Sequence, residues 1–119
     1  MFIAGERERP LAIEHLPDEA AVSVVTIAEL ALGVHMAVDV EARAKRLATL
    51  DAVQATYVAL PIDQAVAAAF PELVATARRA GHRPKVQDTW IAATARVHAA
   101  AVYTQDRDFD DLAVDVKHV

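Results

Sequence analysis

The sequence contains no cysteine among its 119 residues, and it has only three glycines. The absence of cysteine excludes a disulfide framework, a thiolate zinc site and a cysteine nucleophile. No glycine-rich phosphate-binding loop is present, which disfavours a nucleotide-binding enzyme. The five histidines are scattered without a His-x-x-x-His pair, so a histidine metal site is disfavoured as well.

Long hydrophobic runs are also missing from the chain. No apolar stretch approaches the roughly 18 residues that span a bilayer, and residues 1–10 lack the basic-then-apolar order of a signal peptide. We therefore expect a cytoplasmic protein with no membrane contact. Hydrophobic residues still make up 55% of the chain, enough for a buried core, and the length fits one domain over residues 1–119.

The charge balance is acidic, with a formal net charge of -5. This disfavours a protein that binds nucleic acid by charge alone. A nuclease stays open, because carboxylates can hold metal ions that face phosphates, and so does a basic partner. One basic segment, with Arg78, Arg79, Arg83 and Lys85, is typical of a solvated loop or of a contact to the RNA backbone.

Short β-like runs alternate with helical patterns along the sequence. Strands are predicted at residues 21–25, 57–61, 101–104 and 114–119, and helices at 26–34, 39–54, 63–77 and 88–99. Pro71 is expected to kink or divide the third helix. Strands separated by helices imply right-handed βαβ units and a parallel sheet flanked by helices. In such sheets functional groups gather at the carboxyl ends of the strands.

Carboxylates occur at three such positions. Glu29 lies one helical turn after the first of these strands, Asp88 lies in the first turn of a helix, and Asp106 and Asp108 follow the strand 101–104. Mg²⁺ and Mn²⁺ prefer oxygen ligands. Carboxylates that converge from separate elements can hold such ions, which activate water and stabilise charge at a phosphodiester.

Each acidic residue also has a structural interpretation. Glu29 would complete a Thr-x-x-Glu capping box with Thr26. Asp88 would stabilise the N-terminus of its helix through the helix dipole, and Asp106 and Asp108 would be ordinary turn residues. Taken singly, these residues leave both interpretations open.

The order and the amino-acid sequences of three segments resemble those of the PIN domain, especially of the VapC toxins of bacterial toxin–antitoxin pairs. The matching segments are SVVTIAELALG at 23–33, DTWIAATA at 88–95 and VYTQDRDF at 102–109. The strand predicted at 114–119 also looks like the family's last strand, so the resemblance covers nearly the whole chain. Each motif is loose alone, but three in order at ordinary spacing are fairly specific.

The resemblance assigns roles residue by residue. Glu29, Asp88 and Asp106 match the family's acidic metal ligands, Asp108 matches a further acid beside them, and Thr104 matches a residue that supports the cluster. What the family implies is an Mg²⁺- or Mn²⁺-dependent endoribonuclease, the toxin of a type II toxin–antitoxin system. Its substrate would be RNA, its partner a cognate antitoxin, and its oligomeric state often a homodimer.

The N-terminus departs from the family pattern. Members begin with a hydrophobic strand that ends in Asp-x-Ser, whereas residues 1–4 resemble the helix start that follows it. We therefore expect a PIN-like sheet that lacks its first, central strand, together with one metal-binding Asp. Either the natural protein starts upstream of Met1, which we favour because two unpaired neighbouring strands are costly, or the chain is a genuine truncation with impaired activity.

Two alternatives to an active nuclease remain. A catalytically inactive PIN-like module would bind an antitoxin or a partner toxin subunit, with its acids receiving Arg or Lys side chains. A receiver-like signalling domain would need an Asp at the end of a central strand and a Lys that follows a later strand. No predicted strand ends in Asp, and Lys85 and Lys117 are poorly placed, so this alternative is disfavoured.

Overall fold

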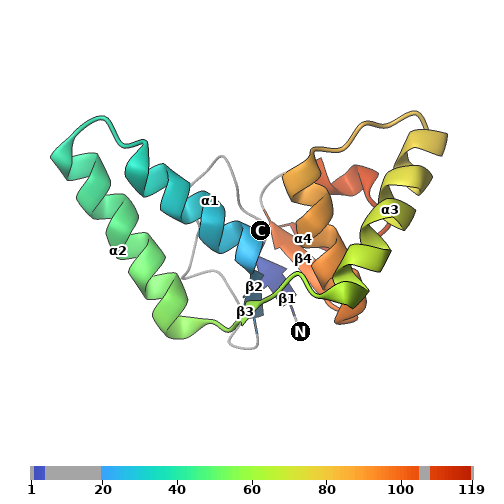
Figure 1. Ribbon diagram of the computed structural model, residues 1–119, viewed down its shortest axis with the longest axis horizontal. Coiled ribbons are helices and arrows are strands. Elements are labelled where there is room, and N and C mark those ends of the chain that lie inside the picture. Colours follow the sequence, from blue (N-terminus) through green and yellow to red (C-terminus); the bar gives the residue numbers. More distant parts are fainter. Residues whose placement is uncertain (1, 5–19, 105–107, 119) are drawn as a thin grey trace.

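The computed structural model describes residues 2–4, 20–104 and 108–118. Along the chain run β1 (Phe2–Ala4), β2 (Ala20–Ser23), α1 (Val24–His35), α2 (Val40–Thr56), β3 (Ala59–Leu60), α3 (Gln64–Arg79), α4 (Val86–Val97), β4 (Ala101–Thr104), the 3-10 helix η2 (Asp108–Asp111) and β5 (Val116–His118). Figure 1 shows α1 and α2 on one side of the strands and α3 and α4 on the other. None of the helices in the described ranges is both long and apolar enough to cross a membrane.

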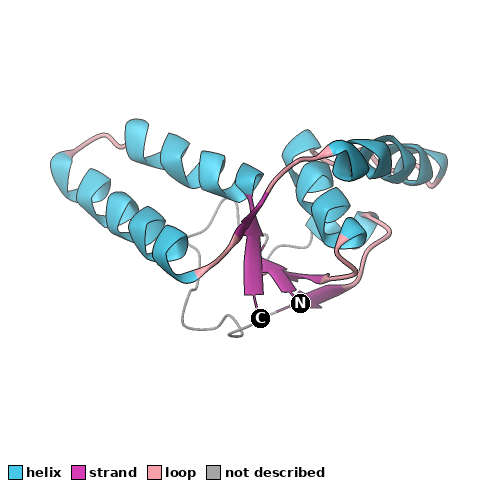
Figure 2. Cartoon of the chain, turned by 60° about the horizontal axis from the view of Figure 1, so that its bottom comes forward, coloured by secondary structure: helices cyan, strands magenta, loops and turns pink. Residues whose placement is uncertain are grey.

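The five strands form one sheet in the order β3-β2-β1-β4-β5, and every neighbouring pair is parallel. Parallel strands need long crossover connections. The α1–α2 pair connects β2 to its neighbour β3, and the α3–α4 pair carries the chain from β3 at one edge of the sheet across to β4. This confirms the predicted α/β class with a parallel sheet flanked by helices. It also directs the carboxyl ends of all five strands to one edge of the sheet. Figure 2 shows the strands between the two helix pairs.

The expectation of a missing central strand is wrong for this structure. Residues Phe2–Ala4 form β1 in the middle of the sheet, where Ile3 pairs with Ala21 on one side and Val102 on the other. Strand pairing uses backbone N–H and C=O groups, so a short apolar segment can form a strand whatever its side-chain pattern. Pairing with β1 also satisfies the backbone hydrogen-bonding groups of both neighbouring strands. However, β1 contains no acidic residue, and Glu6, the first acid after it, lies outside the described residues.

Helices α1 and α2 pack against each other and against the β2 side of the sheet. Val53 of α2 is fully buried and joins Ala20, Val22 and Tyr57 in one apolar cluster. The guanidinium of Arg46 donates a hydrogen bond of 2.7 Å to the carbonyl oxygen of Gly33, which links the two helices directly. The base of this helix pair is therefore fixed to the sheet.

Helices α3 and α4 enclose the larger core. Their buried residues, together with those of β4 and η2, form one cluster of Val66, Ala69, Leu73, Ile91, Ala92, Ala93, Ala95, Ala100, Val102, Phe109 and Leu112. Phe70 stacks on Trp90 with ring centroids 4.0 Å apart at 26°, an arrangement that adds about 0.5–1.5 kcal/mol to the burial of the rings. This packing holds α4 firmly on the sheet.

Pro71 does not divide α3, which is one helix from Gln64 to Arg79. A proline inside a helix removes the hydrogen bond to the carbonyl four residues earlier, here that of Ala67. Both residues are exposed, so this carbonyl is on the solvent side of the helix, where water can bind it. The expectation that Pro71 divides the helix is therefore wrong, because the hydrogen bond that it removes lies on the exposed side of α3 and the packing of the buried side is kept.

Candidate functional site

Asp88 is a buried acid in the first turn of α4. Asp88 is only 1% exposed, and both of its carboxylate oxygens are shielded from solvent. The helix dipole stabilises an acid at this position by about 0.3–1 kcal/mol, whereas burying an ionised carboxylate costs several kcal/mol. The structural interpretation from the dipole alone is therefore too weak to explain why a carboxylate is buried here.

Glu29 lies in the second turn of α1. The helix begins at Val24, and the side chain of the N-cap residue Ser23 accepts a hydrogen bond of 3.1 Å from the amide of Val25. Thr26 is thus inside the helix, so it does not form the capping box that would have explained Glu29. One carboxylate oxygen of Glu29, Oε1, is buried. The capping-box interpretation of Glu29 is therefore wrong.

The two acid-bearing helices meet at the carboxyl edge of the sheet. Helix α1 starts directly after β2, and α4 ends at the amino end of β4, so α4 starts toward the opposite, carboxyl edge. The two helices are in contact in the structure. Glu29 and Asp88 therefore stand in the first two turns of neighbouring helices at the edge where functional groups gather in parallel sheets.

Asp106, the third predicted ligand, lies outside the described residues. Asp108 is the first residue of η2, which follows β4 at the same carboxyl edge, although its side chain is not described. Thr104 ends β4. In the part of the chain that the structure describes, no three His, Asp or Glu side chains form a group suited to a metal ion. The complete set of three ligands therefore stays a prediction.

Two features of this edge were not expected from the sequence. Ser23 is fully buried and caps α1, a role that a serine before an apolar helical pattern does signal. Nδ1 of His82 lies 3.5 Å from Oδ1 of Asp111, so the connection between α3 and α4 reaches η2. No sequence signal links these two residues, because their contact depends on the fold.

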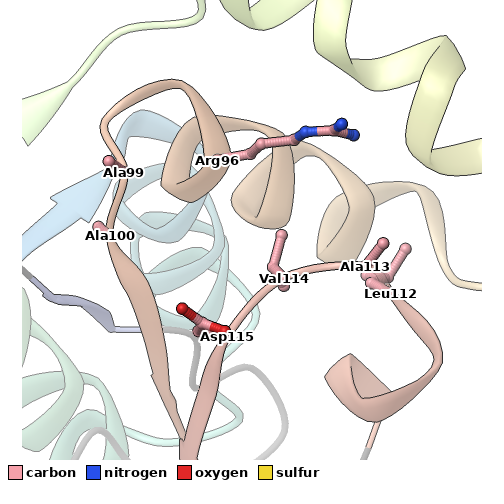
Figure 3. Close-up of a pocket in the computed structure, with 7 residues that line it drawn as sticks. All are labelled: Arg96, Ala99, Ala100, Leu112, Ala113, Val114 and Asp115. Atoms are coloured by element: carbon pink, nitrogen blue, oxygen red, sulfur yellow. The ribbon is translucent and has the colours of Figure 1, made fainter.

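An open depression of the described surface lies elsewhere. It measures about 480 Å³, and its walls come from the end of α4, the start of β4 and the segment that leads into β5 (Figure 3). Ala100 and Asp115 precede their strands, so the depression belongs to the amino edge of the sheet. It is separate from the acid-bearing edge.

Comparison with known proteins agrees with this arrangement. The model of the PIN domain matches residues 2–115. Ribonuclease VapC5 of Mycobacterium tuberculosis is 43% identical over 109 residues, which cover 92% of this chain and 80% of that protein. Ribonuclease VapC4 of the same organism is 47% identical over 91 residues, covering 76% of this chain and 69% of that protein.

Among solved structures, the crystal structure of VapBC-5 from Mycobacterium tuberculosis, a member of the VapBC family of toxin–antitoxin systems, matches with a TM-score of 0.83 and 36% identity. The match covers 98% of this chain and 95% of that chain. This chain belongs to the PIN-domain family, within its VapC branch.

Proposed function

We propose that this chain is a divalent-metal-dependent endoribonuclease, the toxin component of a type II toxin–antitoxin system. The observation that carries the proposal is the buried carboxylate of Asp88, at the start of α4 and at the carboxyl edge of the sheet. The relatives that support it are ribonucleases by name. The substrate would be RNA, which the protein would meet in the cytoplasm.

The donor set fits Mg²⁺ or Mn²⁺. Asp88 and Glu29 bring carboxylate oxygens that are hidden from solvent, and hard divalent cations prefer such oxygens. Carboxylates from two adjoining helices that meet at one edge of the sheet favour a doubly charged cation, because the cation attracts both of them. Asp106 would be the third ligand, and Asp108 would be an auxiliary ligand.

The bound ion would supply Lewis-acid stabilisation of the charge that develops on the scissile phosphodiester. The protein's own residues would position the site. The Ser23 cap fixes the start of α1, which carries Glu29. Thr89 Oγ1 donates a hydrogen bond of 2.8 Å to the carbonyl of Lys85, which supports the first turn of α4 around Asp88. As the alternative to its role as an auxiliary ligand, Asp108 would be the base that orients the attacking water and accepts its proton.

A protein partner would dock on the outer part of the α1–α2 pair. The exposed apolar residues there are Leu32, Met36, Val38, Val40 and Leu47, with Val38 94% and Val40 85% exposed. Because one related structure comes from a toxin–antitoxin family, we propose a cognate antitoxin as this partner. Self-association as a homodimer is a further part of the proposal.

A second candidate is a catalytically inactive module that binds an antitoxin or a partner toxin subunit. It is favoured by one observation, which is that β1 contains no carboxylate although the family pattern has one after its first strand. The two candidates share the fold and the partners. They differ in whether the remaining acids hold a metal ion and cut RNA.

Cleavage of a labelled single-stranded RNA panel in Mg²⁺ or Mn²⁺ separates the candidates. We expect Asp88→Asn to lower the cleavage rate at least about a hundredfold, since it removes a ligand charge. The matched control is Asp51→Asn, an exposed acid on α2, which should cleave like the unaltered chain. Full activity of Asp88→Asn, or no cleavage by the unaltered chain with either metal, would contradict the nuclease proposal.

A further inference from the structure

The connection between α3 and α4 concentrates positive charge on an acidic protein. Residues 78–85, here named the basic segment, include Arg78, Arg79, Arg83 and Lys85 and no acid, a formal charge of +4 in a chain whose net charge is -5. All four basic residues are exposed. We propose that the basic segment binds the phosphate backbone of RNA beside the acid-bearing edge, an inference that rests on the proposed ribonuclease function.

The arginines of the basic segment are available for a ligand. Within the described ranges, no ion pair involves Arg78, Arg79 or Arg83. By contrast, on α2 the ammonium of Lys45 lies 3.7 Å from Glu41, and Arg46 is bound to a backbone carbonyl. The basic segment thus has uncompensated guanidinium groups, which are suited to phosphate oxygens because they can donate two parallel hydrogen bonds.

The basic segment has a fixed shape. At its start, the amide of His82 donates to the carbonyl of Ala77 at 2.9 Å, and the amide of Gly81 donates to that of Arg78 at 3.0 Å. Gly81 has a φ of 85°, so this is a Schellman turn, which requires a left-handed residue. At its end, the carbonyl of Lys85 accepts from both Oγ1 and the amide of Thr89. A preformed site loses less entropy when it binds.

The location of the basic segment connects it with the acids. Lys85 is the N-cap of α4, and Asp88 lies in the first turn of that helix. On the other side, Nδ1 of His82 lies 3.5 Å from Oδ1 of Asp111, in the 3-10 helix that begins at Asp108. The basic segment therefore lies between two elements that carry candidate catalytic acids. RNA bound there would pass the carboxyl edge of the sheet.

The positive charge of the basic segment also has an electrostatic reason to lie near the acidic site. An acidic site repels a polyanionic substrate, and positive charge close by offsets that repulsion and raises the rate of encounter. The helix dipole of α3 accounts for Arg78 and Arg79 in its last turn, but it does not account for Arg83 and Lys85 beyond the turn. The alternative ligand of the basic segment is an acidic segment of a protein partner. Binding of such a segment would give the basic residues no reason to lie next to the candidate catalytic acids.

The test is the salt dependence of RNA binding, measured in EDTA so that no cleavage occurs. Each phosphate contact in single-stranded nucleic acid contributes about 0.7 to the slope of log K against log salt. We therefore expect Arg79→Gln/Arg83→Gln to reduce the slope by about 1.4 between about 50 and 200 mM salt. Affinity at the lower salt should fall severalfold or more.

The matched control is Arg43→Gln/Lys45→Gln, which makes the same charge change on exposed positions of α2 and should keep the original slope. Arg79→Lys/Arg83→Lys retains the charge and should restore most of it. Circular dichroism will report whether each variant is folded. Because these residues are exposed, we expect unchanged spectra.

Several outcomes would overturn the inference. Equal slopes for the Arg79/Arg83 variant and its control, with RNA still bound and cleaved, would refute the basic segment's role and leave the nuclease proposal standing. Normal RNA binding with lost binding of an acidic peptide would assign the segment to a protein partner instead. Failure of the unaltered chain to bind or cleave RNA would refute both proposals.

Discussion

His82, in the connection between α3 and α4, and Asp111, in η2, form a contact of 3.5 Å between Nδ1 and Oδ1, and the two side chains are 45% and 49% exposed. A contact between side chains of this exposure contributes about 0–1 kcal/mol to stability. Its importance is positional, because it joins the basic segment to the element that follows β4.

We therefore expect Asp111→Asn to lower the free energy of unfolding by less than about 1 kcal/mol while it weakens RNA binding measurably. Urea denaturation and RNA binding in EDTA will measure the two effects. The control is Asp115→Asn, an exposed acid in the segment before β5, which should change neither. A large loss of stability in Asp111→Asn would mean that the contact is structural.

Magnesium should stabilise the folded chain if the acids hold it. A ligand that binds only the folded state adds about 2.7 kcal/mol at a hundred times its Kd. We expect Mg²⁺ or Mn²⁺ to raise the Tm of the unaltered chain and to leave the Tm of Asp88→Asn almost unchanged. Differential scanning fluorimetry with and without metal will measure this, and Asp51→Asn should behave like the unaltered chain. An equal shift in all three proteins would indicate non-specific binding.

The Ser23 cap should matter for stability and for cleavage. Replacing an N-cap serine by alanine costs about 0.5–2 kcal/mol, and Ser23→Ala would also loosen the start of the helix that carries Glu29. Asp39→Ala removes the cap of α2, whose carboxylate accepts from the amide of Ala42 at 2.7 Å, and should destabilise similarly. We expect only Ser23→Ala to reduce cleavage below what its stability explains, as single-turnover rates at low temperature will show.

The outer part of the α1–α2 pair should bind the antitoxin without stabilising the monomer. Met36 and Val38 are 68% and 94% exposed, so Met36→Ser/Val38→Ser should change the free energy of unfolding by no more than about 0.5 kcal/mol per site. Affinity for the proposed cognate antitoxin should fall at least about tenfold, because apolar contact area is lost. Titration calorimetry will measure it, with Val86→Ser, an exposed residue of α4, as the control.

The fold was predictable where the sequence pattern was strong. The strand at 101–104 appears as expected, α3 begins one residue after its predicted start at Asp63, and α2 differs from its predicted ends by a residue or two. The start of α1 was missed because Val24 and Val25 are β-branched and favour a strand, while the Ser23 cap turns them into the first helical turn. Propensity was overridden by capping.

The candidate site was only partly predictable. The positions of Glu29 and Asp88 followed from parallel topology, since strand ends share an edge. Their burial did not, because it depends on how α1 and α4 pack. The central strand was missed because three apolar residues carry no period, and only their backbone pairing with β2 and β4 identifies them. The role of Asp106 stays a prediction.

Helix α4 packs against its neighbours through very small side chains, since Ala92, Ala93 and Ala95 are all completely buried. Such a contact has no slack, so a larger residue at any of them forces the whole helix outward. Asp88 lies one to two turns away on the same helix, so its carboxylate would move with the helix. Larger residues at these alanines would therefore cost about 1–3 kcal/mol of stability and, by displacing Asp88, would lower the proposed RNA cleavage in a chain that still folds.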